Sequence, residues 1–356
     1  MILIRKIYTL VAGLALMLCL STNTYSDAEE IAAITDSLGK NMASQNWDAV
    51  DGEYHQLYLA YQDEYGAGSR QALAMAKALG DWIIQAYRSQ LLSKDADEVI
   101  NDASGFFTGL IEDISEQQGA NASDLIDPLY AKAMTEYHLF QLATKKPVDS
   151  YNGSGPEVIK EEVCVDSEDR GGSLDCSYVD VPSRDYLDSQ AFAKTQETTA
   201  HWEAIGLALN QVAEICRVNQ YLLDEAEAKA HIGDYHLYGG EGDVAMDYYS
   251  EAYQLLANNM DPGAGAWAQR LFATTTVVPS LSTSFPGAAP TPITTNGMTY
   301  GFSIKSDGKA ENVEVRSGAS RNNRPAQQNT IGIISGATFR PHFDENGVVE
   351  SASVEI

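Results

Sequence analysis

The stretch AKAHIGDYHLYGGEGDVAMDYYSEAYQLLA, residues 228–257, decides the fold of the larger part of the chain. Gly233 lies in its first half, and Gly240 marks a turn. After the turn, Ala245, Tyr249 and Ala252 recur at i, i+4 and i+7, which places them on one face of a helix. Small residues at Gly233 and Ala245 let two antiparallel helices approach closely, and Tyr249 fills the groove toward the next pair. The stretch predicts a helical hairpin.

Two earlier segments repeat the opening of this stretch. They read AKALGDW at 76–82 and AKAMTEY at 131–137. Repetition of this kind is typical of a solenoid, because each unit buries its apolar face against its neighbours. We therefore expect several helical pairs with a common packing scheme.

The unit at 228–257 resembles a tetratricopeptide repeat. The resemblance rests on five positions, which are Gly233, Gly240, Ala245, Tyr249 and Ala252. It departs from the family at Lys229 and His236, where large aromatic residues are usual, and at Ala257, where proline is usual. The other two units match only in their first helix. The resemblance implies degenerate tetratricopeptide-like pairs with insertions, and an irregular helical domain stays open as the alternative.

Residues 29–272 are predicted to form this helical-repeat domain, with an insertion at 147–183. The insertion combines Gly-rich turns with the β-favouring segments VCV and SYVDV, which predicts a hairpin. Cys164 and Cys176 bracket its polar loop, and we expect a disulfide between them if the compartment is oxidising. Cys216 lies in a helical pattern and is expected to be a buried free thiol.

The composition changes after the helical domain. Residues 273–297 are rich in Thr, Ser and Pro without charge, which predicts a linker. From 298 to 356 the pattern is β: alternating apolar residues flank Asp307-Gly308, a strong hairpin signal. A helix is expected at 323–335, followed by a second hairpin with strands at 337–343 and 348–356. The fold class predicted for the whole chain is α+β.

This ββαβ order, with GFSIKSDG at 301–308, VEVRSG at 313–318 and Phe339-Arg340-Pro341, resembles the C-terminal domain of TonB proteins. Phe339 is expected in the core, and Pro341 at an edge position where its missing N–H is harmless. The resemblance implies a docking module in which a sheet edge accepts an extended peptide as an added strand. The matching edge residues are Val349, Ser351, Ser353 and Glu355. An ordinary edge strand guarded by glutamates is the alternative.

The N-terminus carries an export signal. Arg5 and Lys6 precede the apolar run 7–20 and a polar stretch, which predicts a signal peptide over 1–28. This indicates a periplasmic protein, with inner-membrane anchoring by 7–20 as the alternative. A TonB-type energy transducer for receptor-mediated transport would need that anchor, so it is the second functional hypothesis.

Charge and motif content favour binding over catalysis. The chain has 23 Lys+Arg against 50 Asp+Glu, a net charge of −27, which disfavours nucleic acid. Ser37-Leu38-Gly39-Lys40 reads as SxxK but lies in a predicted helix without its partner motifs, and no metal-ligand spacing or phosphate loop occurs. We therefore expect no enzyme activity, metal site or cofactor. The first hypothesis is a non-catalytic scaffold whose partners are proteins, such as an outer-membrane receptor or other envelope proteins. The sequence leaves its oligomeric state open.

Overall fold

A computed structural model gives the fold of the chain. It describes 27–66, 68–146, 158–167, 173–182, 184–278, 293, 295, 297–318, 323–344, 347–349 and 351–356. The signal peptide predicted at 1–28 lies almost wholly outside these residues, as does most of the linker predicted at 273–297. The chain is α+β, mostly helical with a small C-terminal antiparallel sheet, which confirms the predicted class.

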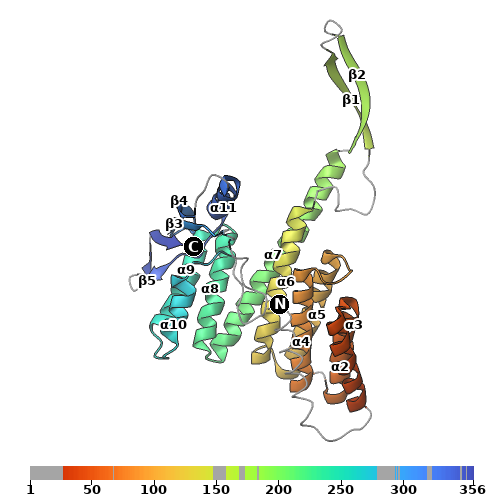
Figure 1. Cartoon of the computed structure of the whole chain (residues 1–356), viewed down its shortest axis with the longest axis vertical. Coiled ribbons are helices and arrows are strands. Elements are labelled where there is room, and N and C mark those ends of the chain that lie inside the picture. The colour runs from red at the N-terminus through yellow and green to blue at the C-terminus, as the bar shows by residue number, and fades with distance from the viewer. Residues whose placement is uncertain are drawn as a thin grey trace. The chain divides into compact units, whose positions relative to one another are not determined.

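The chain divides into two compact units. One contains the described residues up to Thr135 together with Gly206–Ile356, and the other is Glu136–Ile205. The described residues of the larger unit start with four helices, which pack against one another in sequence order (Figure 1). They are α2 (Asp27–Ser44), α3 (Trp47–Tyr65), α4 (Arg70–Ser89) and α5 (Ala96–Gln118). A short turn, η2 (Ser123–Leu125), then leads into α6 (Ile126–Lys145).

The smaller unit contains the predicted insertion. Strands β1 (Val158–Ser167) and β2 (Ser173–Pro182) form an antiparallel ribbon (Figure 1), which confirms the predicted hairpin. The register places Cys164 opposite Cys176, so the backbone is compatible with the disulfide predicted there. The long helix α7 (Arg184–Val218) follows and continues into the larger unit.

Helices α8 (Leu222–Tyr238) and α9 (Gly242–Ala257) form the hairpin expected from residues 228–257. Ala245, Tyr249 and Ala252 are completely buried, as their spacing predicts. Tyr249 differs from the expectation in one respect: its ring lies against Gly233 of its own pair, and it also contacts Phe272 and Phe343 edge-on. The small residues therefore make room for Tyr249 within the pair.

Gly233→Ala tests this packing. A Cβ at Gly233 would lie 2.5 Å from Cε1 of the Tyr249 ring, which is fully buried and cannot withdraw. Alanine normally stabilises a helix relative to glycine by about 1 kcal/mol. Here we expect the overpacking to outweigh that gain and to lower the free energy of unfolding by about 1–3 kcal/mol in urea titrations.

The matched control is Gly109→Ala in α5, where a Cβ would meet nothing within 4 Å. This variant should be stabilised by about 0.5–1 kcal/mol. Equal behaviour of the two variants would contradict close contact between α8 and α9.

The region after α9 includes the start of the predicted linker. Helix α10 (Ala264–Ala268) runs into the π-helical turn η5 (Gln269–Ala273). Residues that follow then pair with the C-terminal part: Val277 forms a β-bridge with Phe339, and the Val278 N–H donates to the Thr338 carbonyl at 2.9 Å. The chain is therefore hydrogen-bonded to the C-terminal part as far as Val278, inside the segment that the composition predicts to be a linker.

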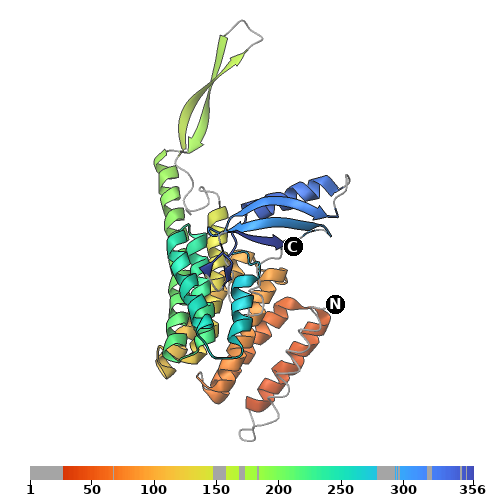
Figure 2. The same cartoon turned by 90° about the vertical axis from the view of Figure 1, so that its left-hand side faces the viewer.

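The C-terminal part contains β3 (Thr299–Lys305), β4 (Ala310–Ser317), α11 (Arg324–Gly336), β5 (Phe343–Asp344), β6 (Gly347–Val348) and β7 (Ser351–Glu355). Its sheet has the order β4-β3-β7, all antiparallel, and α11 packs against β4 (Figures 1 and 2). Asp307-Gly308 makes the β3–β4 turn as predicted: Gly308 has φ 77°, and the Asp307 carboxylate accepts the Lys309 N–H at 3.0 Å.

The second predicted hairpin differs from the structure. Residues 338–339 form isolated bridges instead of a strand, the hairpin is reduced to β5 and β6, and β7 leaves it to pair with β3. On α11, Ile334 is buried, whereas Ile333 is 48% exposed. Alternation indicates that a segment is extended, but the burial available from β3 decides where it pairs.

Candidate functional site

The candidate site is the edge of the C-terminal sheet along β7. Tyr300, Phe302 and Ile304 alternate along β3 and bury their side chains in a core with Ile334 and Phe339. Phe339 is completely buried, as predicted. The side chains of β7 follow the same alternation, because Ala352 is buried and Ser351, Ser353 and Glu355 are exposed. The sheet therefore has one core face and one outer face.

The hydrogen-bond phase of the ladder determines which backbone groups of β7 are free. Tyr300 and Ile356 exchange both N–H···O bonds, each at 3.0 Å. In an antiparallel pair, hydrogen-bonded and non-hydrogen-bonded residue pairs alternate. The backbone N–H and C=O groups of Val354 and Ala352 therefore also point toward β3. The N–H and C=O groups of Ser351, Ser353 and Glu355 consequently point away from β3, toward the outer edge. These three residues are among those that the sequence singled out.

Val349, the fourth residue predicted for this edge, does not belong to β7. Its N–H donates to the carbonyl of His342 at 2.9 Å, which prolongs the small β5–β6 pairing. Pro341 is buried and lies between the Phe339 bridge and β5, so its missing N–H interrupts no ladder. The usable edge is therefore Ser351–Glu355.

The opposite edge of the sheet, β4, is less regular. The β3–β4 register shifts between Gly301 and Ser303, and Asn312 has a φ of 56°. Such a bulge twists an edge and interrupts the row of groups that a further strand would need. Within the described C-terminal sheet, β7 is the straight edge.

The outer face of the sheet is hollowed. A groove of about 490 Å³ runs across all three strands and is lined by residues that include Gly301, Ser303, Arg316, Ser353 and Glu355. Glycine and serine form its floor next to the Arg316 side chain, which covers Gly301, so the lining is polar. Side chains of a strand added beside β7 would reach this groove.

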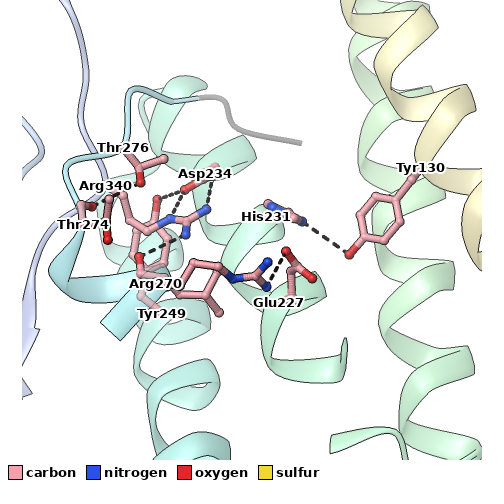
Figure 3. A network of polar contacts seen from close by, with 10 residues as sticks. Tyr130, Glu227, His231, Asp234, Tyr249, Arg270, Thr274, Thr276 and Arg340 are labelled. Atoms are coloured by element: carbon pink, nitrogen blue, oxygen red, sulfur yellow. Dashed lines mark hydrogen bonds and ion pairs between the residues drawn. The ribbon is translucent and has the colours of Figure 1, made fainter. Parts of the chain in front are cut away.

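A buried ion pair fixes the C-terminal part to the helices of the same unit (Figure 3). The guanidinium of Arg340 donates from Nε to Asp234 Oδ1 at 2.8 Å and from a terminal nitrogen to Oδ2 at 2.5 Å. Its other terminal nitrogen donates to the Leu271 carbonyl at 3.1 Å. Arg340 is 2% exposed and Asp234 is fully buried. This forked geometry satisfies both charges, as a buried pair requires.

Two further hydrogen bonds adjoin the ion pair of Arg340 and Asp234, and the ion pair with these bonds is called the Arg340 lock. The Tyr249 hydroxyl donates to Asp234 Oδ1 at 2.8 Å, and the Arg340 N–H donates to the Thr276 carbonyl at 2.8 Å. Burial, followed by the nearby Asp234 charge, raises the pKa of Tyr249 well above its usual value. Tyr249 of α9 thus binds the same carboxylate of α8 that accepts from Arg340.

A second polar layer lies beside the lock on α8 (Figure 3). The Glu227 carboxylate accepts from Arg270 at 2.9 Å, and burial raises the pKa of Glu227. His231 Nδ1 lies 3.3 Å from the Tyr130 hydroxyl. Burial, followed by the positive charge of Arg340, lowers the pKa of His231 to about 3, so this imidazole is neutral near pH 7. These groups satisfy one another and leave no activated nucleophile.

An acid stands at the place of Asp234 in each of the three similar segments of the sequence. Asp234 follows Gly233 in the third unit, Asp81 follows Gly80 in the first, and Glu136 holds the same place in the second. Glu136 is 4% exposed and lies 2.6 Å from His201 Nδ1. Asp81 Oδ1 is buried without a hydrogen-bond partner among the described residues. Of these three acids, Asp234 pairs with an arginine and Glu136 with a histidine, whereas Oδ1 of Asp81 accepts no hydrogen bond from a described residue.

Sequence reasoning placed Arg340 in a structural motif and missed its partner. The sequence signal that could identify this partner, Asp234, is the acid that follows a small residue in all three similar segments. A buried carboxylate needs a cation beside it. Cys216 is a buried free cysteine, as expected, and burial raises the pKa of its thiol to about 12. The thiol is therefore protonated and unreactive near pH 7.

The described residues contain no cluster of three or more metal-ligating side chains, and none of their helices combines the length and apolarity needed to cross a membrane. Comparison of the sequence with protein-family models gives no match, and comparison with curated proteins gives none either. The functional proposal therefore rests on the geometry of the β7 edge and its attachment.

Proposed function

We propose that this protein is a non-catalytic interaction protein of the periplasm, exported by its N-terminal segment, that binds an extended segment of a partner protein along β7. The observation that carries the proposal is the set of outward backbone groups at Ser351, Ser353 and Glu355. In strand addition, such groups supply the main-chain hydrogen bonds, and alternate side chains supply specificity.

The attachment of the sheet supports this role. A docking edge must be held in place if binding is to be relayed to the rest of a scaffold. The Arg340–Asp234 pair and the Val277–Phe339 bridge hold the C-terminal part against α8 and η5. The proposed partner is an envelope protein with an unpaired extended segment, such as an outer-membrane receptor. The tetratricopeptide-like and TonB-like assignments are part of the same proposal.

In-cell photocrosslinking from Ser353 provides the partner, and amide hydrogen exchange then tests the binding mode. Amides of Ser351, Ser353 and Glu355 have no bond within the sheet and should exchange quickly in the free protein. Ala352 and Val354 are bonded to β3 and should exchange slowly. Partner binding should protect the first set. Binding that leaves those three amides unprotected would contradict strand addition.

Ser353→Pro gives a mutational counterpart. Proline removes the outward N–H of Ser353 without removing a bond to β3, so stability should change little. We expect affinity for the captured partner to fall about tenfold or more, because one main-chain bond is lost and the ring obstructs the approach.

Ala352→Pro is the matched control. Its N–H faces β3, so this substitution should lower the free energy of unfolding itself. Titration calorimetry and urea unfolding on both variants separate the two effects. Unchanged affinity of the folded Ser353→Pro variant would exclude the β7 edge.

A further inference from the structure

The register of the sheet places one glutamate on each side of a glycine. On the outer face, Gly301 of β3 lies opposite Glu314 of β4 and opposite Glu355 of β7. The three residues form one row across the sheet. A strand added outside β7 would place a fourth residue in this row, directly beside Glu355.

Arg316 compensates only one of these two carboxylates. Its guanidinium pairs with Glu314 at 2.8 Å, and its side chain lies over Gly301, where a Cβ would come within 2.5 Å of Nε. Glu355 forms no hydrogen bond or ion pair with another described residue. The inner part of the row is thus neutralised, whereas its open end carries an unpaired negative charge.

The neighbouring row leaves room for a long side chain. Ser303 and Ser353 lie opposite each other, and both line the groove of about 490 Å³ next to Gly301 and Glu355. The other glutamate on this face, Glu311, pairs with Lys305 at 3.3 Å. Small polar residues therefore form the space into which a side chain beside Glu355 would extend.

We propose that the segment docked on β7 carries a lysine or arginine beside Glu355, and that Glu355 determines this specificity. The inference rests on the proposed function and names the chemistry of its ligand, an extended basic segment with alternating apolar residues. Opposite charges in directly facing cross-strand positions attract, and like charges repel. The net charge of −27 also attracts a basic segment as it approaches the protein.

Three capped synthetic peptides test the proposal on the full chain. Their sequence is Thr-Val-Xaa-Val-Xaa-Val-Thr, with Xaa as lysine, glutamine or glutamate. The apolar positions suit the face of Ala352 and Val354, so the variable positions face the groove. At low salt we expect the affinity of the lysine peptide to be about fivefold higher than that of the glutamine peptide. Its affinity should be about tenfold or more higher than that of the glutamate peptide. At 1 M salt the difference should shrink.

Glu355→Gln should abolish the preference, whereas Glu311→Gln should keep it, since Glu311 lies on the far strand with its own lysine. Equal binding of the three peptides, or a preference that survives Glu355→Gln, would overturn the inference while strand docking stands. Failure of all three peptides to bind or to protect the amides of Ser351, Ser353 and Glu355 would count against the proposed function itself.

Discussion

Replacing Arg340 by methionine is expected to lower the free energy of unfolding by about 3–5 kcal/mol. The substitution preserves much of the side-chain volume but removes the guanidinium donors that bind Asp234 and the Leu271 carbonyl. Asp234 would keep a charge at 0% exposure, with the Tyr249 hydroxyl as its remaining donor among the contacts of the lock. Urea titration near pH 7 measures the loss.

Two variants sharpen this test. Arg316→Met removes an exposed arginine that pairs with Glu314 on the sheet surface, and it should cost less than about 1 kcal/mol. Combining Asp234→Asn with Arg340→Met removes both charges, so the double variant should be more stable than Arg340→Met alone. A cost for Arg340→Met no larger than that for Arg316→Met would show that the lock is dispensable.

The Arg340 lock also links stability to the proposed docking edge. Loss of the guanidinium frees the segment that bonds to Thr276 and bridges Val277, and Phe339 of that segment packs under β3. We therefore expect amide exchange in β3 and β7 to accelerate in Arg340→Met before the helices α8 and α9 are affected. Through the same contacts, residues 276–278 are paired with residues 338–340.

The sequence predicted those elements whose cause is local. The 3.6-residue spacing of Ala245, Tyr249 and Ala252 fixes one face of α9, and the Asp307-Gly308 turn fixes the β3–β4 hairpin, because neither depends on distant residues. Phe339 was assigned to the core from its chemistry alone. In each case the side chain can satisfy its requirement with a neighbour in sequence or with any apolar surface.

What the sequence did not predict depends on distant pairing. Arg340 and Asp234 are 106 residues apart, and any of the 50 acidic residues could have been the partner of this arginine. Likewise, the alternation at 348–356 identifies an extended segment but not its partner strand, so β7 was assigned to a hairpin with the preceding residues and not to β3. Val349 was included in the edge for the same reason. Pairing is decided by the burial of Ala352 and Val354 against β3, which is a property of the assembled sheet.

The second large effect is expected at Asp81, the acid of the first repeat. Burial is the main cause that raises the pKa of Asp81 to about 6; Lys77 opposes the shift and Asp127 adds to it. Lys77 itself pairs with Asp127, so its charge is shared. In contrast to Asp234, Asp81 has no arginine in its buried environment, although it occupies the equivalent place after a glycine that contacts an aromatic ring, Phe107.

The sign of the pH dependence follows from this raised pKa. With a pKa of about 6, folded Asp81 holds its proton up to about pH 6, whereas the unfolded chain releases it near the ordinary aspartate pKa of 3.8. Between these values the folded state binds more protons, so the contribution of Asp81 to stability is fully present below pH 3.8 and is lost as the pH rises through 6. The loss at pH 7 amounts to about 2–3 kcal/mol.

Asp81→Asn should therefore stabilise the protein at pH 7 by about 1–3 kcal/mol and change its stability little at pH 4, because the amide imitates the protonated carboxyl. Urea titrations of both proteins from pH 4 to pH 8 should diverge through the range 4–6. Asp36→Asn, at an exposed residue of α2 paired with Lys40, serves as the control for a change at the surface and should alter stability by less than about 1 kcal/mol. A pH-independent effect of Asp81→Asn would contradict a buried, uncompensated carboxyl. A divergence confined to Asp81 would show that burial of this carboxyl, without a strong cation beside it, is what makes the stability depend on pH.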